Sequence, residues 1–162
     1  MITQSRLKEL LHYDPDTGVF TWLVSRQRIR CGDVAGCIRS DGYRKIGVVG
    51  KPYQAHRLAW LYMTGSWPKD GTDHRNGVKD DNRWDNLREA TQCENNQNMA
   101  IPSTNTSGFM GVSWDAQAGK WKAAIGIAGR VKNIGRFTTP EAAHAAYLSA
   151  KAETHTFQPT PR

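Results

Sequence analysis

One short segment of the chain brings together side chains that can do acid–base and metal chemistry. Asp73 and His74 stand side by side, just before the pair Asn76-Gly77. An imidazole can take up a proton near neutral pH, and a carboxylate oxygen is a ligand for a hard metal ion. Asn-Gly is the strongest short signal for a hairpin turn, so Asp73 and His74 are predicted to lie at a strand end. Taken alone, the segment would be interpreted as an ordinary polar turn.

Three asparagines follow this pair. Asn82 and Asn86 lie within a stretch predicted to be a loop followed by a second short strand. Thr91-Gln92-Cys93-Glu94 matches a capping box, which predicts a helix that starts at Thr91. Asn95 falls in the first turn of that helix, where its side chain can point back at the hairpin. The pattern of strand, turn, strand and helix predicts a compact ββα unit.

The series Asp73-His74, Asn82, Asn86-Leu87-Arg88 and Asn95 resembles the HNH endonucleases, in the branch found in phage genomes and homing elements. The resemblance covers residues 70–99, and the upstream segment is similar to the N-terminal arm of that family. It implies that His74 is the general base and that Asn86 braces the loop. It also implies that Asn95 belongs to the catalytic set and, with Asp73, holds one divalent ion.

The residue types suit this chemistry. Hydrolysis of a phosphodiester needs a water activated near neutral pH, which histidine provides, and a cation that neutralises charge. Carboxylate and carboxamide oxygens favour Mg²⁺ or Mn²⁺ over zinc. Some members of the family hold zinc with two Cys-x-x-Cys pairs, but the three cysteines here, Cys31, Cys37 and Cys93, form no such pair. No zinc is therefore expected, and the thiols are predicted to be buried.

The charge balance indicates the class of partner. Lys plus Arg number 22 against 15 Asp plus Glu, for a formal net charge of +7, which favours nucleic acid over a membrane. No apolar run approaches about 18 residues, so a transmembrane helix is excluded, and the charged start predicts no signal peptide. We expect a cytoplasmic protein, in the host cytoplasm if it is phage-encoded. Its expected partner is double-stranded DNA, with no membrane and no obligatory protein partner.

The segment before the hairpin is predicted to form two helices and two strands. The predicted ranges are a helix over Thr3–His12, strands over Val19–Val24 and Tyr43–Val49, and a helix over Ala55–Thr64. Arg26, Arg28 and Arg30 belong to a basic cluster that could grip DNA phosphates, and a solvated loop is an equally good interpretation. His56 has no acidic neighbour and is interpreted as a structural or phosphate-facing histidine.

The C-terminal third carries a second pattern, with three strands followed by one helix. Thr139-Pro140-Glu141 opens the helix, and its predicted packing face is Ala142, Ala143, Ala146, Tyr147 and Ala150. His144 is predicted to lie on the surface. Gly111-Val112, Gly119-Lys120-Trp121 and Ile134-Gly135-Arg136-Phe137 are similar to the plant APETALA2-type, ethylene-response-factor DNA-binding domain. The resemblance implies that the sheet lies in the major groove with the helix behind it.

Strand alternation assigns the faces of this sheet. Trp121, Ala123, Ile125 and Ile127 are predicted to pack on the helix, so the open face should carry Lys120, Lys122, Ser113, Asn133 and Gly135. We expect the lysines to contact phosphates, and Ser113 and Asn133 to contact base edges. No base preference is implied, because the positions that read bases in the plant domain hold other residue types here. The alternative is a small module whose basic residues merely keep it soluble.

These patterns together predict an α+β protein. Residues 1–100 are assigned to an HNH nuclease domain with its ββα core at 70–99, 101–107 to a linker, 108–157 to the APETALA2-like domain and 158–162 to a tail. The predicted function is metal-dependent cleavage of double-stranded DNA. A DNA-binding regulator with an inactive HNH fold competes with it, and the charge alone would also fit an RNA-binding factor. The complete set of Asp73, His74 and Asn95 favours the nuclease.

Overall fold

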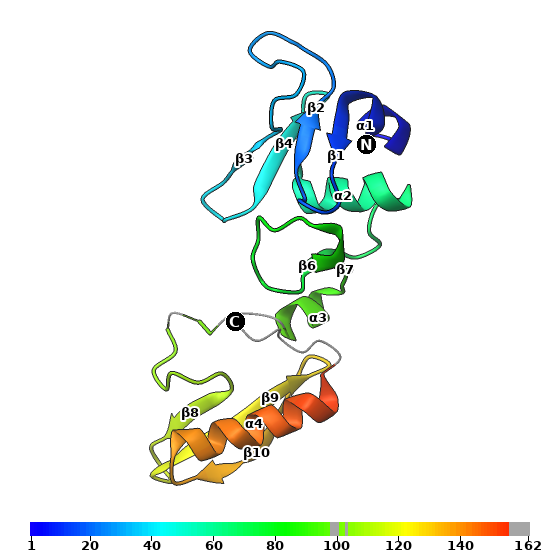
Figure 1. Ribbon diagram of the computed structural model, residues 1–162. Helices are drawn as coiled ribbons and strands as arrows, with labels where there is room; N and C mark the ends of the chain where they lie inside the picture. The colour runs from blue at the N-terminus through cyan, green and yellow to red at the C-terminus, as the bar shows by residue number, and fades with distance from the viewer. Residues whose placement is uncertain (98–100, 103, 156–162) are drawn as a thin grey trace. The chain divides into compact units, whose positions relative to one another are not determined.

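The structure, a computed structural model, describes residues 1–97, 101–102 and 104–155, and it divides into two compact units. The first unit runs from Met1 to Gln92, and the second begins at Cys93. Both units combine small antiparallel sheets with helices, which confirms the α+β class (Figure 1). The division falls ahead of the expected linker at 101–107, and the expected tail at 158–162 lies outside the described residues. The domain assignment stays a prediction.

The first unit opens with a helix and a strand pair. Helix α1 (Gln4–Leu10) is capped by Thr3, whose hydroxyl accepts a hydrogen bond from the Arg6 N–H. It ends earlier than expected, because the chain then becomes strand β1 (Leu11–Tyr13), in which Leu11 and Tyr13 alternate into the core. Strand β1 pairs antiparallel with β2 (Phe20–Trp22).

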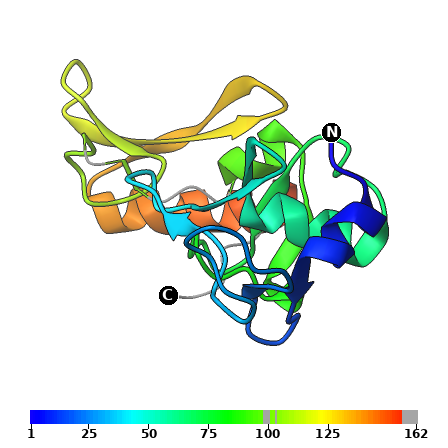
Figure 2. The same ribbon diagram turned by 90° about the horizontal axis from the view of Figure 1, so that it is seen from above.

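The next sheet has the order β3-β4-β5, formed by β3 (Cys37–Ile38), β4 (Arg44–Val48) and β5 (Lys51–Gln54). Val49 and Gly50, with φ of 49° and 72°, join β4 to β5 in a two-residue turn. Helix α2 (Ala55–Thr64) follows β5 directly and ends, as expected, at Gly65, where φ is 81°. The helix packs on α1, as Figure 2 shows, and on β4, β5 and β6.

The predicted ββα segment is present in outline. Strand β6 (Thr72–His74) pairs antiparallel with β7 (Leu87–Glu89), with Asp73 opposite Arg88. The connection is a long loop that includes the 3-10 helix η1 (Trp84–Asn86), so Asn76-Gly77 lies within the loop and does not close a tight hairpin. Helix α3 (Gln92–Gln97) begins one residue after the predicted start.

One hydrophobic core holds the first unit together. Its fully buried members include Leu7 of α1, Phe20 of β2, Ile46 of β4 and Leu58 of α2. Leu87 of β7 belongs to the same core and is 4% exposed. Burial of apolar surface therefore anchors the β6–β7 pair to the helices and sheets that precede it in the sequence.

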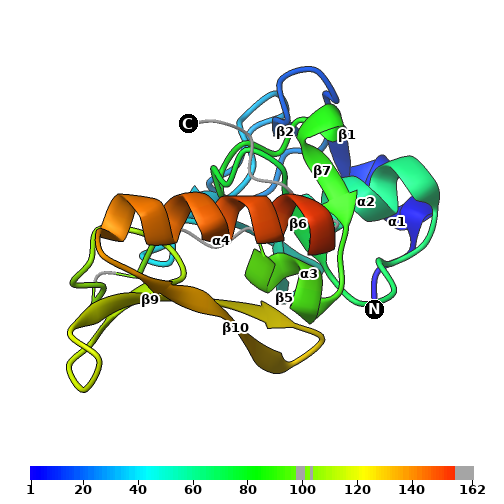
Figure 3. The same cartoon turned by 90° about the horizontal axis from the view of Figure 1, so that it is seen from below.

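The second unit contains a three-stranded sheet and a long helix. The sheet has the order β10-β9-β8, formed by β8 (Val112–Asp115), β9 (Lys120–Ile127) and β10 (Arg130–Phe137). Helix α4 (Pro140–Thr154) packs on all three strands, as Figures 1 and 3 show. The Thr139 hydroxyl caps it as predicted by accepting from the Ala142 N–H, but Ala142 itself is exposed. The buried side of α4 is formed by Ala143, Tyr147 and Lys151.

The cysteines and the apolar character of the helices were also the subject of predictions. Cys31, Cys37 and Cys93 are all exposed, so the prediction of buried thiols is wrong. None of the helices in the described part of the chain is long and apolar enough to cross a membrane.

Candidate functional site

His74 is the buried side chain at the centre of the candidate site. It ends strand β6 opposite Leu87, and only 4% of its surface is exposed. Burial lowers the pKa of His74 below its ordinary value, while the hydrogen bond to Asn82 and the carboxylates of Asp73, Asp81 and Asp80 oppose that shift. The imidazole is consequently neutral at neutral pH, which is the form that can accept a proton.

Asn82 determines which nitrogen of His74 carries the hydrogen. The Asn82 side-chain Nδ2 donates to the backbone carbonyl of Asp80 at 3.0 Å, so its Oδ1 is the atom that faces His74 Nε2 at 3.3 Å. A carbonyl oxygen can only accept, and therefore Nε2 must be the N–H of the neutral ring. The lone pair is then on Nδ1, which makes Nδ1 the basic nitrogen.

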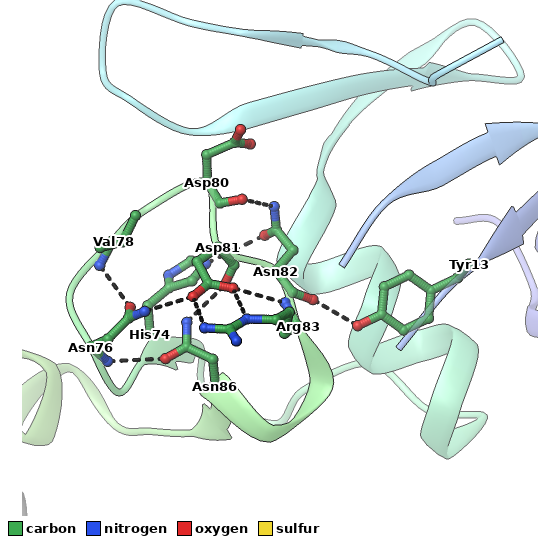
Figure 4. A network of polar contacts seen from close by, with 9 residues as sticks. All are labelled: Tyr13, His74, Asn76, Val78, Asp80, Asp81, Asn82, Arg83 and Asn86. Carbon is green, nitrogen blue, oxygen red and sulfur yellow. Dashed lines mark hydrogen bonds and ion pairs between the residues drawn. The ribbon is translucent and has the colours of Figure 1, made fainter. Parts of the chain in front are cut away.

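Asn86 bridges the loop that follows His74, and Figure 4 shows the network around it. Its Oδ1 accepts from the Asn76 backbone N–H at 3.0 Å, and its Nδ2 donates to the Asp81 carbonyl at 2.7 Å. The Asp81 carboxylate accepts from the Asn76 amide at 2.6 Å and from the Arg83 guanidinium. The Arg83 guanidinium is the main cause that lowers the pKa of Asp81 to about 2, so this carboxylate stays ionised.

The N-terminal arm supports the same loop from the other side. The buried Tyr13 hydroxyl donates to the Asn82 carbonyl at 2.6 Å, and burial raises the pKa of this phenol. The Trp84 N–H donates to the Pro15 carbonyl at 2.9 Å. Gly18, at φ +73°, lies so close that an added Cβ would come within 2.4 Å of the Arg83 nitrogen. The loop is therefore held both by its own asparagines and by the turn after β1.

Asp73 is paired with Arg88 on the neighbouring strand. Its Oδ2 accepts from Arg88 Nε at 2.9 Å and from Nη2 at 2.6 Å, and the side chains are 12% and 15% exposed. A carboxylate oxygen is a fitting donor for a hard divalent ion, but in this arrangement Arg88 occupies Oδ2. Among the residues that the structure describes, no three His, Cys, Asp or Glu side chains come together as a metal cluster. A site made by one Asp and one Asn would not count as such a cluster, because asparagine is not one of these four residue types.

Asn95, the other expected ligand, lies in helix α3 within the second unit and is partly buried. His74, Asn86 and Asp73 all belong to the first unit. The structure thus brings three of the four expected catalytic and metal-binding residues together, and the role of Asn95 stays a prediction.

The three arginines of the basic cluster are all exposed. Arg26 and Ile29 exchange backbone hydrogen bonds, which places Arg28 at the tip of a tight turn. Arg26 is held in place, because its guanidinium lies 4.2 Å from the centre of the Trp22 ring and donates to the Gly47 carbonyl. Arg28 therefore lies exposed at the tip of the turn, beside an Arg26 side chain that is held in place.

The open face of the second unit carries the predicted lysines. Ser113, Lys120 and Asn133 are exposed, and Lys122 is partly exposed. In the sheet Ser113 pairs with Lys122 and Asn133 with Ala124, so these residues share one face. Ala123 and Ile125 are buried on the opposite face, as predicted.

A bulge in β10 changes one assignment on this face. The register shifts between Asn133 and Gly135, so Gly135 lies opposite buried Ala123 and Arg136 lies opposite Lys122. The placement of Gly135 on the open face is therefore wrong, because the extra residue reverses the alternation beyond it. Arg136 takes its place and pairs with Asp115 at 2.8 Å.

Sequence reasoning missed several supporting residues. Arg136 was not predicted to lie on the open face, because the bulge before it was not predicted. A glycine inside a strand is only a weak signal for a bulge. Tyr13 carries no sequence signal for its contact with Asn82, which lies 69 residues away. His56 is 5% exposed and therefore not phosphate-facing, and His144 packs on Phe109 and Tyr147 instead of lying free on the surface.

Comparison of the sequence with known proteins gives three findings. Residues 53–97 match the HNH endonuclease family. Protein 3.8 of Escherichia phage T7 is 34% identical over 85 residues, which is 52% of this chain and 70% of that protein. DNA endonuclease I-HmuI of Bacillus phage SP01 is 37% identical over 73 residues, which is 41% of this chain and 41% of that enzyme.

A solved structure described as DNA binding and cleavage by the HNH homing endonuclease I-HmuI is also similar. The likeness covers 83% of this chain and 75% of that chain, with 24% sequence identity and a TM-score of 0.44. The family match includes His56, His74 and Asn86, and the relative from phage T7 is covered over more than two thirds of its length. The chain therefore belongs to the HNH endonuclease family.

Proposed function

We propose that this protein is a metal-dependent endonuclease that hydrolyses phosphodiester bonds of double-stranded DNA, with His74 as the general base. The observation that carries the proposal is the buried, neutral His74, whose Nε2 donates to Asn82 and whose Nδ1 is the basic atom. The match of residues 53–97 to the HNH endonuclease family and the similarity to a phage protein named a DNA endonuclease support the same activity.

In the proposed reaction His74 Nδ1 takes a proton from a water as its oxygen forms a bond to phosphorus. The bond from phosphorus to the leaving oxygen breaks, and that oxygen gains a proton from solvent. Asn86 and Asn82 hold the loop and the ring in place during this step. A base at its operating pH contributes typically about 10²- to 10⁴-fold to the rate.

We assign one Mg²⁺ or Mn²⁺ to the oxygens of Asp73 and Asn95. When bound, such an ion supplies positive charge for the phosphate and the leaving oxygen. The support is the donor chemistry of a carboxylate and a carboxamide. Arg88 must share or release Asp73 when the ion binds.

We assign DNA binding to two exposed basic surfaces. In the first unit it is the turn with Arg26, Arg28 and Arg30, and in the second it is the open sheet face with Ser113, Lys120, Lys122 and Asn133. The three-stranded sheet backed by one helix supports the likeness to the APETALA2-type domain. The lysines would contact phosphates, and Ser113 and Asn133 base edges.

Incubation of the purified protein with supercoiled plasmid tests the activity. We expect nicked or linear products with Mg²⁺ or Mn²⁺, no products with EDTA, and no stoichiometric zinc by elemental analysis. A plasmid that is retarded on the gel but never cut with any of the ions would favour the DNA-binding regulator. One tightly held zinc per chain would overturn the assignment of the metal.

Asn95→Ala tests the ligand assignment. We expect cutting at low Mg²⁺ to be lost and to return in part at raised Mg²⁺, because one of the ligands has been removed. Asn96→Ala, a change at the exposed neighbouring position, is the matched control. Unchanged cutting by Asn95→Ala at low Mg²⁺ would show that Asn95 is not a ligand.

A further inference from the structure

Three aromatic rings form a cluster at the buried side of His74. His56 and His74 meet at right angles, with ring centres 5.0 Å apart and an interplanar angle of 89°. Tyr43 contacts both, at 5.3 Å from the centre of His56 and 6.0 Å from that of His74. The two histidines are 5% and 4% exposed, so the contact lies inside the protein. None of the steps proposed for the reaction uses His56.

Helix α2 holds His56 in place. This histidine stands in the first turn of α2, next to Ala55 and two residues before Leu58, both fully buried. The helix packs on β4, β5 and β6, so it cannot turn without breaking the core. Tyr43 is held in turn by Lys79, whose ammonium lies 5.0 Å from the centre of its ring. The His56 ring is therefore a fixed surface.

The hydrogen bond to Asn82 restrains the Nε2 atom of His74, and the ring contact with His56 restrains the plane of the ring. A turn of the ring about the line from Cβ to Nε2 would keep the bond at 3.3 Å and would still move Nδ1. The lone pair of Nδ1 lies in the ring plane, so a turned ring aims it away from the proton it must accept. An edge-to-face ring contact has a preferred geometry and resists this rotation.

We propose that His56 is a positioning residue for the reaction, which sets the plane of the His74 ring through ring packing and does not touch the substrate. This inference rests on the proposed role of His74 as general base. Burial lowers the pKa of His56 to about 3, so His56 is neutral near pH 7 and puts no positive charge beside His74. The proposed role requires only a flat, neutral ring, so a phenylalanine at position 56 should preserve it.

Paired substitutions test the proposal. His56→Leu fills the site with an apolar side chain but removes the flat ring, whereas His56→Phe keeps it. We expect kcat for plasmid cutting to fall about 10- to 100-fold in His56→Leu with KM within about twofold. His56→Phe should stay within about fivefold of wild type. Leu58→Ala, in the same helix and fully buried, is the control for lost stability. It should lower Tm while kcat, measured well below Tm, stays at the wild-type value.

A measurement without DNA or metal makes the test independent of cutting. The residual dipolar couplings of the His74 ring C–H bonds, assigned by the loss of their resonances in His74→Ala, report the orientation of the ring. They should change in His56→Leu and stay at the wild-type values in His56→Phe and Leu58→Ala. Unchanged His74 couplings in His56→Leu would overturn the proposal, as would a loss of kcat in Leu58→Ala equal to that in His56→Leu. If wild type does not cut any plasmid, the proposed function fails, whereas the orientation of the ring is still decided by the couplings.

Discussion

The loop around His74 and the open sheet face of the second unit are built in opposite ways. In the loop, Asn76, Asp81, Asn82 and Asn86 bond to one another or to backbone, and Tyr13 adds a buried bond. On the sheet face Lys120 is exposed and Lys122 is partly exposed, and Arg136 forms an ion pair with Asp115. The difference fits the two tasks. Proton transfer requires positions fixed to fractions of an ångström, whereas phosphate contacts require mainly charge.

The comparison predicts that substitutions in the loop act on kcat and that substitutions on the sheet act on DNA affinity. Single changes in the loop should have large effects, because a buried polar network is costly to leave partly satisfied. Changes on the sheet should be smaller and dependent on salt.

The largest effect is expected for His74→Ala. Loss of the general base should lower the rate of cutting by about 10²- to 10⁴-fold, while binding of a labelled duplex, measured by fluorescence anisotropy without metal, persists. His12→Ala, at an exposed histidine of β1, is the control and should cut normally. Cutting by His74→Ala at the wild-type rate would remove His74 from the mechanism.

The next effect is expected for Asn82→Ala, which removes the acceptor of His74 Nε2. We expect kcat to fall about 10- to 100-fold, as for other groups that orient a catalytic histidine. In wild type the ring ¹⁵N shifts of His74 should report a hydrogen on Nε2, and in Asn82→Ala a mixture of both tautomers. The same single tautomer in both proteins would contradict the assignment of Nδ1 as the basic atom.

Lowering the pH should reduce the free energy of unfolding, because His56 is buried in its neutral form. The pKa of His56 is about 3 in the folded protein and about 6.5 when unfolded, so the unfolded chain binds a proton more readily between these values. Stability is full above about pH 6.5 and falls as the pH drops, by up to about 1.4 kcal/mol per pH unit. Urea unfolding at pH 7, 6 and 5 should show this loss, and His56→Phe should reduce it. If the free energy of unfolding falls equally with pH in wild type and His56→Phe, another group causes the loss of stability.

The smallest effect is expected on the open sheet face. Lys120→Ala with Lys122→Ala, in the His74→Ala protein without metal, should lower the salt slope of DNA binding by about one to two units for every sequence tested. Lys132→Ala is the control, because exposed Lys132 lies opposite Ile125 of the buried face. Asn133→Ala should alter preference among sequences and leave the slope unchanged. An unchanged slope in the double variant would show that this face does not touch DNA.

Local patterns in the sequence determined which elements form and which residue types the site contains. The capping of α4 by Thr139 and the end of α2 at Gly65 follow from interactions within a few residues, and such signals are visible in sequence. Asp73 and His74 were singled out by their place before Asn76-Gly77, whereas the roles expected of His74 and Asn86 came from the resemblance to the HNH endonucleases.

Tertiary structure alone decided how these residues are supported. Tyr13 meets Asn82, and His56 meets His74, through packing between elements far apart in sequence, which no local pattern encodes. The pairing of Arg136 with Asp115 depends on a bulge that reverses the side-chain alternation in β10. Propensity and periodicity act over one turn or one strand, whereas the plane of the His74 ring is set by a hydrophobic core that forms only when the first unit has folded.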